Sequence, residues 1–166
     1  MSKTIWEKYA DVLVDYSTNV QKGDIVIIRS EAQAQPLIKA VYEAVLKKGA
    51  YPITKLSIEG LSEIYFKTAT DEQLEYIDPF IKYEYDHADK FISIDAPYNT
   101  KNLTRLPSEK LAKRSSATRP LSDKLLQRAA EGSLSWVICN FPTNALAQEG
   151  KMSLSEYEEF LFNACY

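Results

Sequence analysis

The sequence predicts a three-layer α/β domain in which a mainly parallel sheet of about four strands carries helices on both faces. Short apolar runs rich in β-branched residues alternate along the chain with segments of helical periodicity. This alternation favours parallel strands joined by right-handed crossovers. The 166 residues can form one domain with its own core, and 45% hydrophobic with 26% charged residues is typical of globular domains. We expect a single domain over residues 1–166 with strand order 2-1-3-4.

The chain opens with an amphipathic helix that should pack on the sheet. Its apolar residues recur on one helical face, and they are Ile5, Tyr9, Val12, Leu13 and Tyr16. A turn at Gly23 leads into residues 25–28, Ile-Val-Ile-Ile. Such a run is typical of a strand that is covered on both faces, so we place a central strand there.

A second helix and an edge strand follow. Pro36 suits the first turn of a helix, whose apolar stripe consists of Leu37, Ile38, Val41, Ala44 and Val45. Two lysines and Gly49 should end it, because cations stabilise the carboxyl end of a helix and glycine adopts left-handed conformations. Residues 51–58 predict a strand, and Pro52 favours a sheet edge because it lacks an N–H group.

Residues 60–89 predict several short helices before a third strand at 90–95. The residues expected to face inward in the first helix are Leu61, Ile64 and Tyr65. A Thr-x-x-Gln capping box begins at Thr70, and Asp78 precedes a proline in the arrangement of a second helix start. These helices should bridge the second and third strands.

Residues 106–132 predict helical structure that Pro120 interrupts. An interior proline loses a hydrogen bond and clashes with the preceding turn, so either one helix kinks or two helices meet there. Gly132 ends this segment, and residues 134–139 predict the fourth strand.

Basic side chains of the helical segment around Pro120 could bind an acidic partner or a peptide carboxylate, although a solvated helix face is the commoner role. They are Lys110, Lys113, Arg114, Arg119, Lys124 and Arg128.

The last segment begins with a turn at Phe141-Pro142, because Pro142 disfavours helical conformation in the residue before it. An ordered connection should lead to Ser153, which has capping-box spacing to Glu156. The apolar face of the final helix consists of Leu154, Tyr157, Phe160 and Leu161.

Charge and cysteine usage exclude several classes of protein. A net charge of −3 and a pI near 5.3 argue against a nucleic-acid binder. The longest aliphatic run, residues 25–28, is too short to span a membrane, and the first residues show no signal core, so we expect a cytoplasmic protein. Cys139 and Cys165 form no CxxC or Cys/His cluster, so we expect buried, reduced thiols.

Polar residues follow three of the expected strands, at the edge where open parallel sheets bind ligands. We take them as candidates for one wall of a substrate cleft, and they are Arg29, Ser30, Glu31, Asp95, Tyr98, Asn140 and Thr143. Turn and capping roles need no ligand and stay an alternative for the same residues. The first turn contains neither G-x-G-x-x-G nor a P-loop, which argues against nucleotide binding.

His87 is the one histidine of the sequence and stands between Asp86 and Asp89. Zinc sites usually take at least three protein ligands, and no second histidine or partner cysteine is present. We therefore expect a surface or half-buried histidine and no metal site in this chain.

The two ends of the chain carry a resemblance to a known family. An aromatic-Pro-Thr turn, Ala-x-Ala-Gln-Glu and Met-Ser-x-x-Glu-Tyr-x-x-Phe resemble the end of the N-terminal domain of the aminopeptidase T and aminopeptidase S family, metal-dependent aminopeptidases with thermophilic members. The matching residues are Phe141, Pro142, Thr143, Ala145, Ala147, Gln148, Met152, Ser153, Glu156, Tyr157 and Phe160. Residues 6–24 are more weakly similar to the opening of that family.

The resemblance implies an enzyme that removes N-terminal amino acids from peptide substrates with a divalent metal, zinc or cobalt. In that family the ligands, which are Glu, His and Asp side chains, lie in a C-terminal half that has no counterpart here. We expect no catalytic residue in this chain.

The chain should therefore be an N-terminal domain whose partner is the absent C-terminal catalytic domain. It would cover or wall the active site and be inactive alone, and the helical pattern that continues through residues 163–166 supports this view. The sequence leaves open whether two copies form a homodimer. The alternative is a complete, non-enzymatic α/β binding or interaction module.

Overall fold

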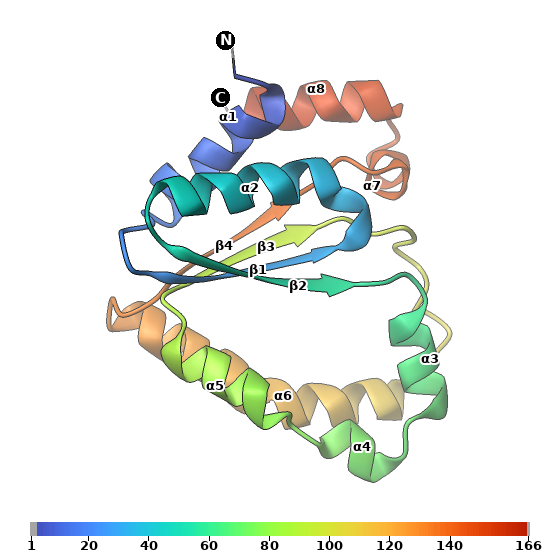
Figure 1. Ribbon diagram of the computed structural model, residues 1–166. Helices are drawn as coiled ribbons and strands as arrows, with labels where there is room; N and C mark the ends of the chain where they lie inside the picture. Colours follow the sequence, from blue (N-terminus) through green and yellow to red (C-terminus); the bar gives the residue numbers. More distant parts are fainter. Residues whose placement is uncertain (1–2, 166) are drawn as a thin grey trace.

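The computed structural model describes residues 3–165 and has the predicted α/β architecture (Figure 1). Four parallel strands form one sheet in the order β2-β1-β3-β4, which confirms the expected order. The strands are β1 Ile25–Glu31, β2 Tyr51–Ser57, β3 Lys90–Asp95 and β4 Ser135–Asn140. Pro52 lies on edge strand β2, where no neighbour needs the N–H group that it lacks.

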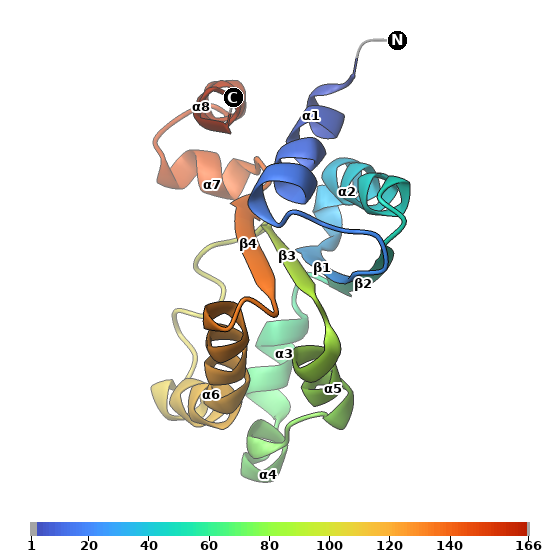
Figure 2. The same cartoon turned by 90° about the vertical axis from the view of Figure 1, so that its left-hand side faces the viewer.

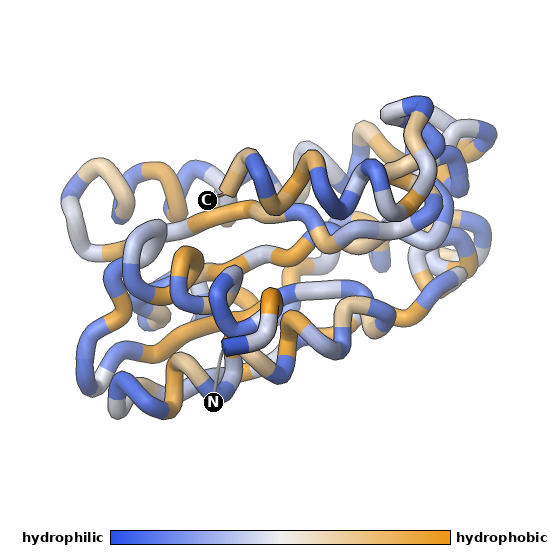
Figure 3. The backbone as a smooth tube through the Cα atoms, turned by 90° about the horizontal axis from the view of Figure 1, so that it is seen from above, coloured by the Kyte–Doolittle hydropathy of each residue, from blue (hydrophilic) through white to orange (hydrophobic). Residues whose placement is uncertain are grey.

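One layer of helices packs above the sheet in the view of Figure 1. It contains α1 (Ile5–Asp11), the π-helix η1 (Val12–Ser17), the short η2 (Ala32–Ala34), α2 (Gln35–Lys47), α7 (Asn144–Glu149) and α8 (Leu154–Cys165). The main core joins this layer to the sheet through Val26, Ile28 and Ile92 of the central strands and Leu37 and Val41 of α2. Burial of each such side chain contributes about 1.5–3 kcal/mol. In Figure 3 the helices alternate between apolar and polar colours along their length, as amphipathic helices do.

The opposite layer contains α3 (Leu61–Thr68), α4 (Asp71–Glu75), α5 (Pro79–His87) and α6 (Ser108–Ala130). A smaller core of Ile27, Ala88, Phe91 and Leu134 joins it to the amino-terminal half of the sheet. Figure 1 shows α5 and α6 below the strands, with α3 and α4 at the side where the strands end. The carboxyl half of this sheet face therefore has less helical cover than the amino half.

The two chain ends that carry the family resemblance pack on each other (Figure 2). The Trp6 ring stacks on Phe141 with centroids 5.0 Å apart and meets Phe162 edge-on at 5.5 Å. The Tyr9 hydroxyl donates a hydrogen bond to the main-chain oxygen of Asn140 at 3.2 Å. The aromatic residues of both motifs thus fix α1 and α8 beside the end of β4.

Several sequence predictions of inward-facing residues are wrong. Tyr16 is 88% exposed, because the wider π-helical turns of η1 change the angular spacing and bury Val14 instead. Leu61 and Ile64 are exposed, since α3 lies at the end of the sheet rather than over it. Phe160 is also exposed, whereas Tyr157 and Leu161 of the same helix are buried, as predicted.

Two other boundaries differ from expectation. Pro120 lies inside one continuous helix, α6, so the alternative of two separate helices is wrong; Figure 2 shows the two halves of α6 running in different directions. The connection after Pro142 contains α7, which the sequence analysis missed. Thr143 begins this helix by accepting a hydrogen bond from the Leu146 N–H group at 3.2 Å.

The basic side chains of α6 mostly hold the neighbouring helices, which neither sequence interpretation predicted. Arg114 donates to the carbonyl oxygens of Leu74 and Tyr76, where α4 ends. Arg128 does the same for Tyr85 and Ala88 at the end of α5. Cations stabilise helix carboxyl ends, where carbonyl groups lack partners. Lys110 donates to the Ala69 carbonyl oxygen at the end of α3. Lys113 and Lys124 form ion pairs with Asp71 of α4 and Asp86 of α5.

Candidate functional site

A cavity of about 780 Å³ lies against the carboxyl half of the sheet. Four of the sequence-predicted candidates line it, and they are Arg29, Ser30, Glu31 and Asp95. Ile27 and Phe91 face the layer of α5 and α6, and alternate residues of a strand share a face. Arg29, Glu31 and Asp95 therefore point to that same side, whereas the buried Ser30 donates its hydroxyl to the Glu31 carbonyl oxygen at 3.1 Å.

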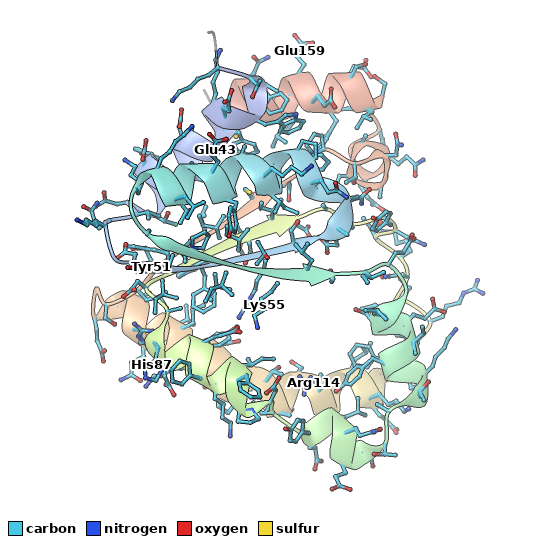
Figure 4. The ribbon with its side chains drawn as sticks, viewed as in Figure 1. Glu43, Tyr51, Lys55, His87, Arg114 and Glu159 are labelled. Atoms are coloured by element: carbon cyan, nitrogen blue, oxygen red, sulfur yellow. The ribbon has the colours of Figure 1, made fainter. Side chains whose placement is uncertain are left out.

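Two cations that line the cavity share one carboxylate of the neighbouring helix layer. Arg29 and Lys55 are register partners on β1 and β2. The Lys55 ammonium lies 2.5 Å from Glu84 of α5, and the Arg29 guanidinium lies 3.5 Å from the same carboxylate. Arg29 also donates to the Tyr85 hydroxyl at 2.8 Å and lies 4.7 Å from the centroid of the Phe91 ring. Figure 4 shows Lys55 pointing from β2 toward the helices of the opposite layer.

Two carboxylates occupy the strand ends. Glu31 accepts a hydrogen bond from the Ala96 N–H group at 2.7 Å and so connects β1 to the loop after β3. Partial burial, followed by the negative charge of Glu31, raises the pKa of the Asp95 carboxyl above its usual value. Within residues 3–165 the Asp95 carboxylate has no hydrogen bond or ion pair. The negative charge at this end of the cavity is therefore uncompensated.

The other predicted residues lie beside this cavity or serve the fold. Tyr98 lines an adjacent cavity of about 400 Å³ that Glu31 and Asp95 also border. Asn140 donates a hydrogen bond to the Tyr157 hydroxyl at 3.3 Å. Thr143 caps α7 and is 5% exposed. Thr143 thus has a capping role and Asn140 connects β4 to α8, whereas the strand-end residues of β1 and β3 meet at one cavity.

Sequence reasoning missed the cavity residue Lys55 and its ion-pair partner Glu84. Lys55 lies on a strand that was correctly predicted. Its register pairing with Arg29 places its side chain on the same face of the sheet as Arg29, but this register is not visible in the sequence. Glu84 reaches Lys55 and Arg29 from α5, and nothing in its local sequence indicates which way that helix turns.

The histidine and cysteine candidates form no metal-binding cluster in the part of the chain that the structure describes. His87 is exposed, its ring stacks on Tyr83 at 3.9 Å, and its Nδ1 atom lies 2.9 Å from the Tyr83 carbonyl oxygen. Among residues 3–165 no group of three or more His, Cys, Asp or Glu side chains could hold a metal ion. Burial raises the pKa of the Cys139 thiol to about 12, so it stays protonated and unreactive.

Residues 2–166 match the family model described as thermophilic metalloprotease (M29). The chain belongs to this family. It is also similar to the solved structure of wild-type AmpT from Thermus thermophilus, with 20% identity and a TM-score of 0.75 over 97% of this chain and 42% of that chain. At this identity the likeness shows the shared fold alone, and this chain spans less than half of that relative. No curated protein matches the chain significantly.

Membership of the M29 family implies a divalent metal, yet the side chains described here do not supply a set of ligands for one. Lys55 and Arg29 beside Glu31 and Asp95 would also repel a divalent metal ion. In the part of the chain that the structure describes, no helix has the length and apolar character needed to cross a membrane.

Proposed function

We propose that this chain forms the N-terminal domain of a metal-dependent aminopeptidase that releases N-terminal amino acids from peptides in the cytoplasm. The match of nearly the whole chain to the metalloprotease family carries this proposal. The coverage of 42% of the structural relative supports a domain of a longer enzyme. A zinc or cobalt ion would be held by residues outside this chain, because those described here do not form its site.

The domain would wall the active site rather than perform the reaction. Its open cavity lies at the carboxyl edge of the sheet, where α/β proteins commonly bind ligands. Exposed apolar side chains on β4 and α8, which are Trp136, Ile138 and Phe160, offer contact area for a second domain. The proposed partners are therefore that catalytic domain and the peptide substrates of the whole enzyme.

The proposal is tested by the mass and activity of the native protein that carries this sequence. Immunoblotting with intact-mass measurement should find a product about twice this length, as the coverage of the relative implies. The purified product should release N-terminal residues from peptides, lose this activity with a chelator and regain it with zinc or cobalt. A native product that ends at residue 166 and releases no amino acid would instead support a non-enzymatic binding module.

A further inference from the structure

The cavity face of the sheet carries two rows of side chains with opposite charge. In the first row Lys55 pairs in register with Arg29, which pairs in register with Ser93. In the second row Ser57 pairs with Glu31. Asp95 extends this second row, since it follows the register pair of Ser30 with Ile94. The first row is cationic and the second is anionic, and the rows are two residues apart along every strand.

Neither row is neutralised by the protein. The two cations of the first row share one carboxylate, Glu84, which leaves an excess positive charge and unused N–H donors. The second row contains two carboxylates, and no cation within residues 3–165 contacts either of them. The raised pKa of Asp95 has the same physical origin, namely partial burial beside Glu31 without a compensating positive charge.

We infer that this cavity binds a dipeptide in its zwitterionic form, with the free ammonium group against Glu31 and Asp95 and the free carboxylate against Arg29 and Lys55. Two residues of strand place the rows about 6.6 Å apart. An extended dipeptide spans about 7 Å, whereas a single amino acid spans about half of that distance and a tripeptide about 10 Å. The cavity volume of about 780 Å³ accommodates a molecule of this size.

The charge pattern disfavours other classes of ligand. A divalent cation would meet only two carboxylates, with Arg29 and Lys55 close by. A phosphate or nucleotide would gain from the cationic row but would face the repulsion of Glu31 and Asp95. A zwitterion is the class that supplies the counter-charge missing at each row. Residues of this chain would bind both charged ends of the zwitterion. This binding does not depend on the reaction proposed for the parent enzyme.

The test is a titration of the 166-residue chain with dialanine, followed by amide NMR and calorimetry. Dialanine should shift the amide signals of the carboxyl halves of β1, β2 and β3. N-acetyl-dialanine lacks the ammonium group and dialanine amide lacks the carboxylate, so each should bind at least tenfold more weakly. Alanine and trialanine should also bind more weakly, because neither spans the two rows.

Asp95→Asn should weaken dialanine binding at least fivefold, because it removes charge from the anionic row without disturbing any contact of the fold. Glu159→Gln is the matched control, since Glu159 is an exposed carboxylate on α8, and Figure 4 shows it on the other side of the sheet from the cavity residue Lys55. This control should bind like the parent chain. Circular dichroism should show both variants folded.

Equal binding of dialanine and its two blocked forms would overturn the inference, as would the absence of binding at millimolar dialanine. Either result would leave the aminopeptidase proposal intact if the native protein shows chelator-sensitive activity. Specific dialanine binding by this chain, together with an inactive native protein, would overturn the aminopeptidase proposal and leave the dipeptide site.

Discussion

Replacing Arg128 with methionine removes a cation that ties α6 to the end of α5 and to the turn before β4. Its guanidinium donates to the carbonyl oxygens of Tyr85 at 3.0 Å, Ala88 at 2.7 Å and Ser133 at 3.1 Å. Methionine keeps most of the apolar stem but none of the donors. The part-buried carbonyl groups of Tyr85 and Ala88 would then lose a charged partner.

Hydrogen bonds to charged groups contribute about 1.5–3 kcal/mol each, but neighbouring bonds are not additive and water can replace some of them. We therefore expect Arg128→Met to lower the free energy of unfolding by about 2–4 kcal/mol, measured by urea denaturation. Arg119→Met is the control on the same helix, because Arg119 is exposed and its nitrogen lies 3.9 Å from Asp123. It should change stability by less than about 0.5 kcal/mol. Equal losses in the two variants would refute the capping role.

Three further predictions concern other positions. Thr143→Ala should cost about 1 kcal/mol of stability in urea, whereas Thr143→Ser should retain most of it, because a hydroxyl group caps α7; equal losses would contradict the cap. Iodoacetamide at neutral pH should modify Cys139 far more slowly in the folded chain than in urea, as mass spectrometry would show, since burial raises its pKa to about 12. The raised pKa of Asp95 means that its carboxyl favours the folded state only while protonated, and this contribution is lost as pH rises through the folded-state pKa. Asp95→Asn should therefore raise the urea midpoint at neutral pH, and the gain should vanish below the ordinary pKa of aspartate; a gain that does not depend on pH would contradict the assignment.

The sheet was predictable because each strand carries a local signature. The β-branched run of β1 indicated a strand that is covered on both faces, and Pro52 marked β2 as an edge. Errors arose where tertiary geometry decides exposure. The π-helical turns that expose Tyr16 have no signal in a search for 3.6-residue periodicity, and the exposure of Leu61 depends on where α3 sits relative to the sheet.

Part of the candidate site was predictable because its strands can be recognised from their local sequence. Arg29, Glu31 and Asp95 follow from strand direction alone, because the carboxyl ends of parallel strands share one edge. Lys55 required the register between β2 and β1, and Glu84 required the orientation of α5. The opposite charge of the two rows emerges only when all these strands and helices are placed together.

The absence of metal ligands from this domain can be tested by assaying the 166-residue chain alone with an aminoacyl chromogenic substrate and added zinc or cobalt. The domain is proposed to wall an active site whose metal ligands lie elsewhere, so we expect no turnover above the metal-only background and no tight metal binding. Turnover that a chelator abolishes and metal restores would contradict this account, because it would place the chemistry within these residues.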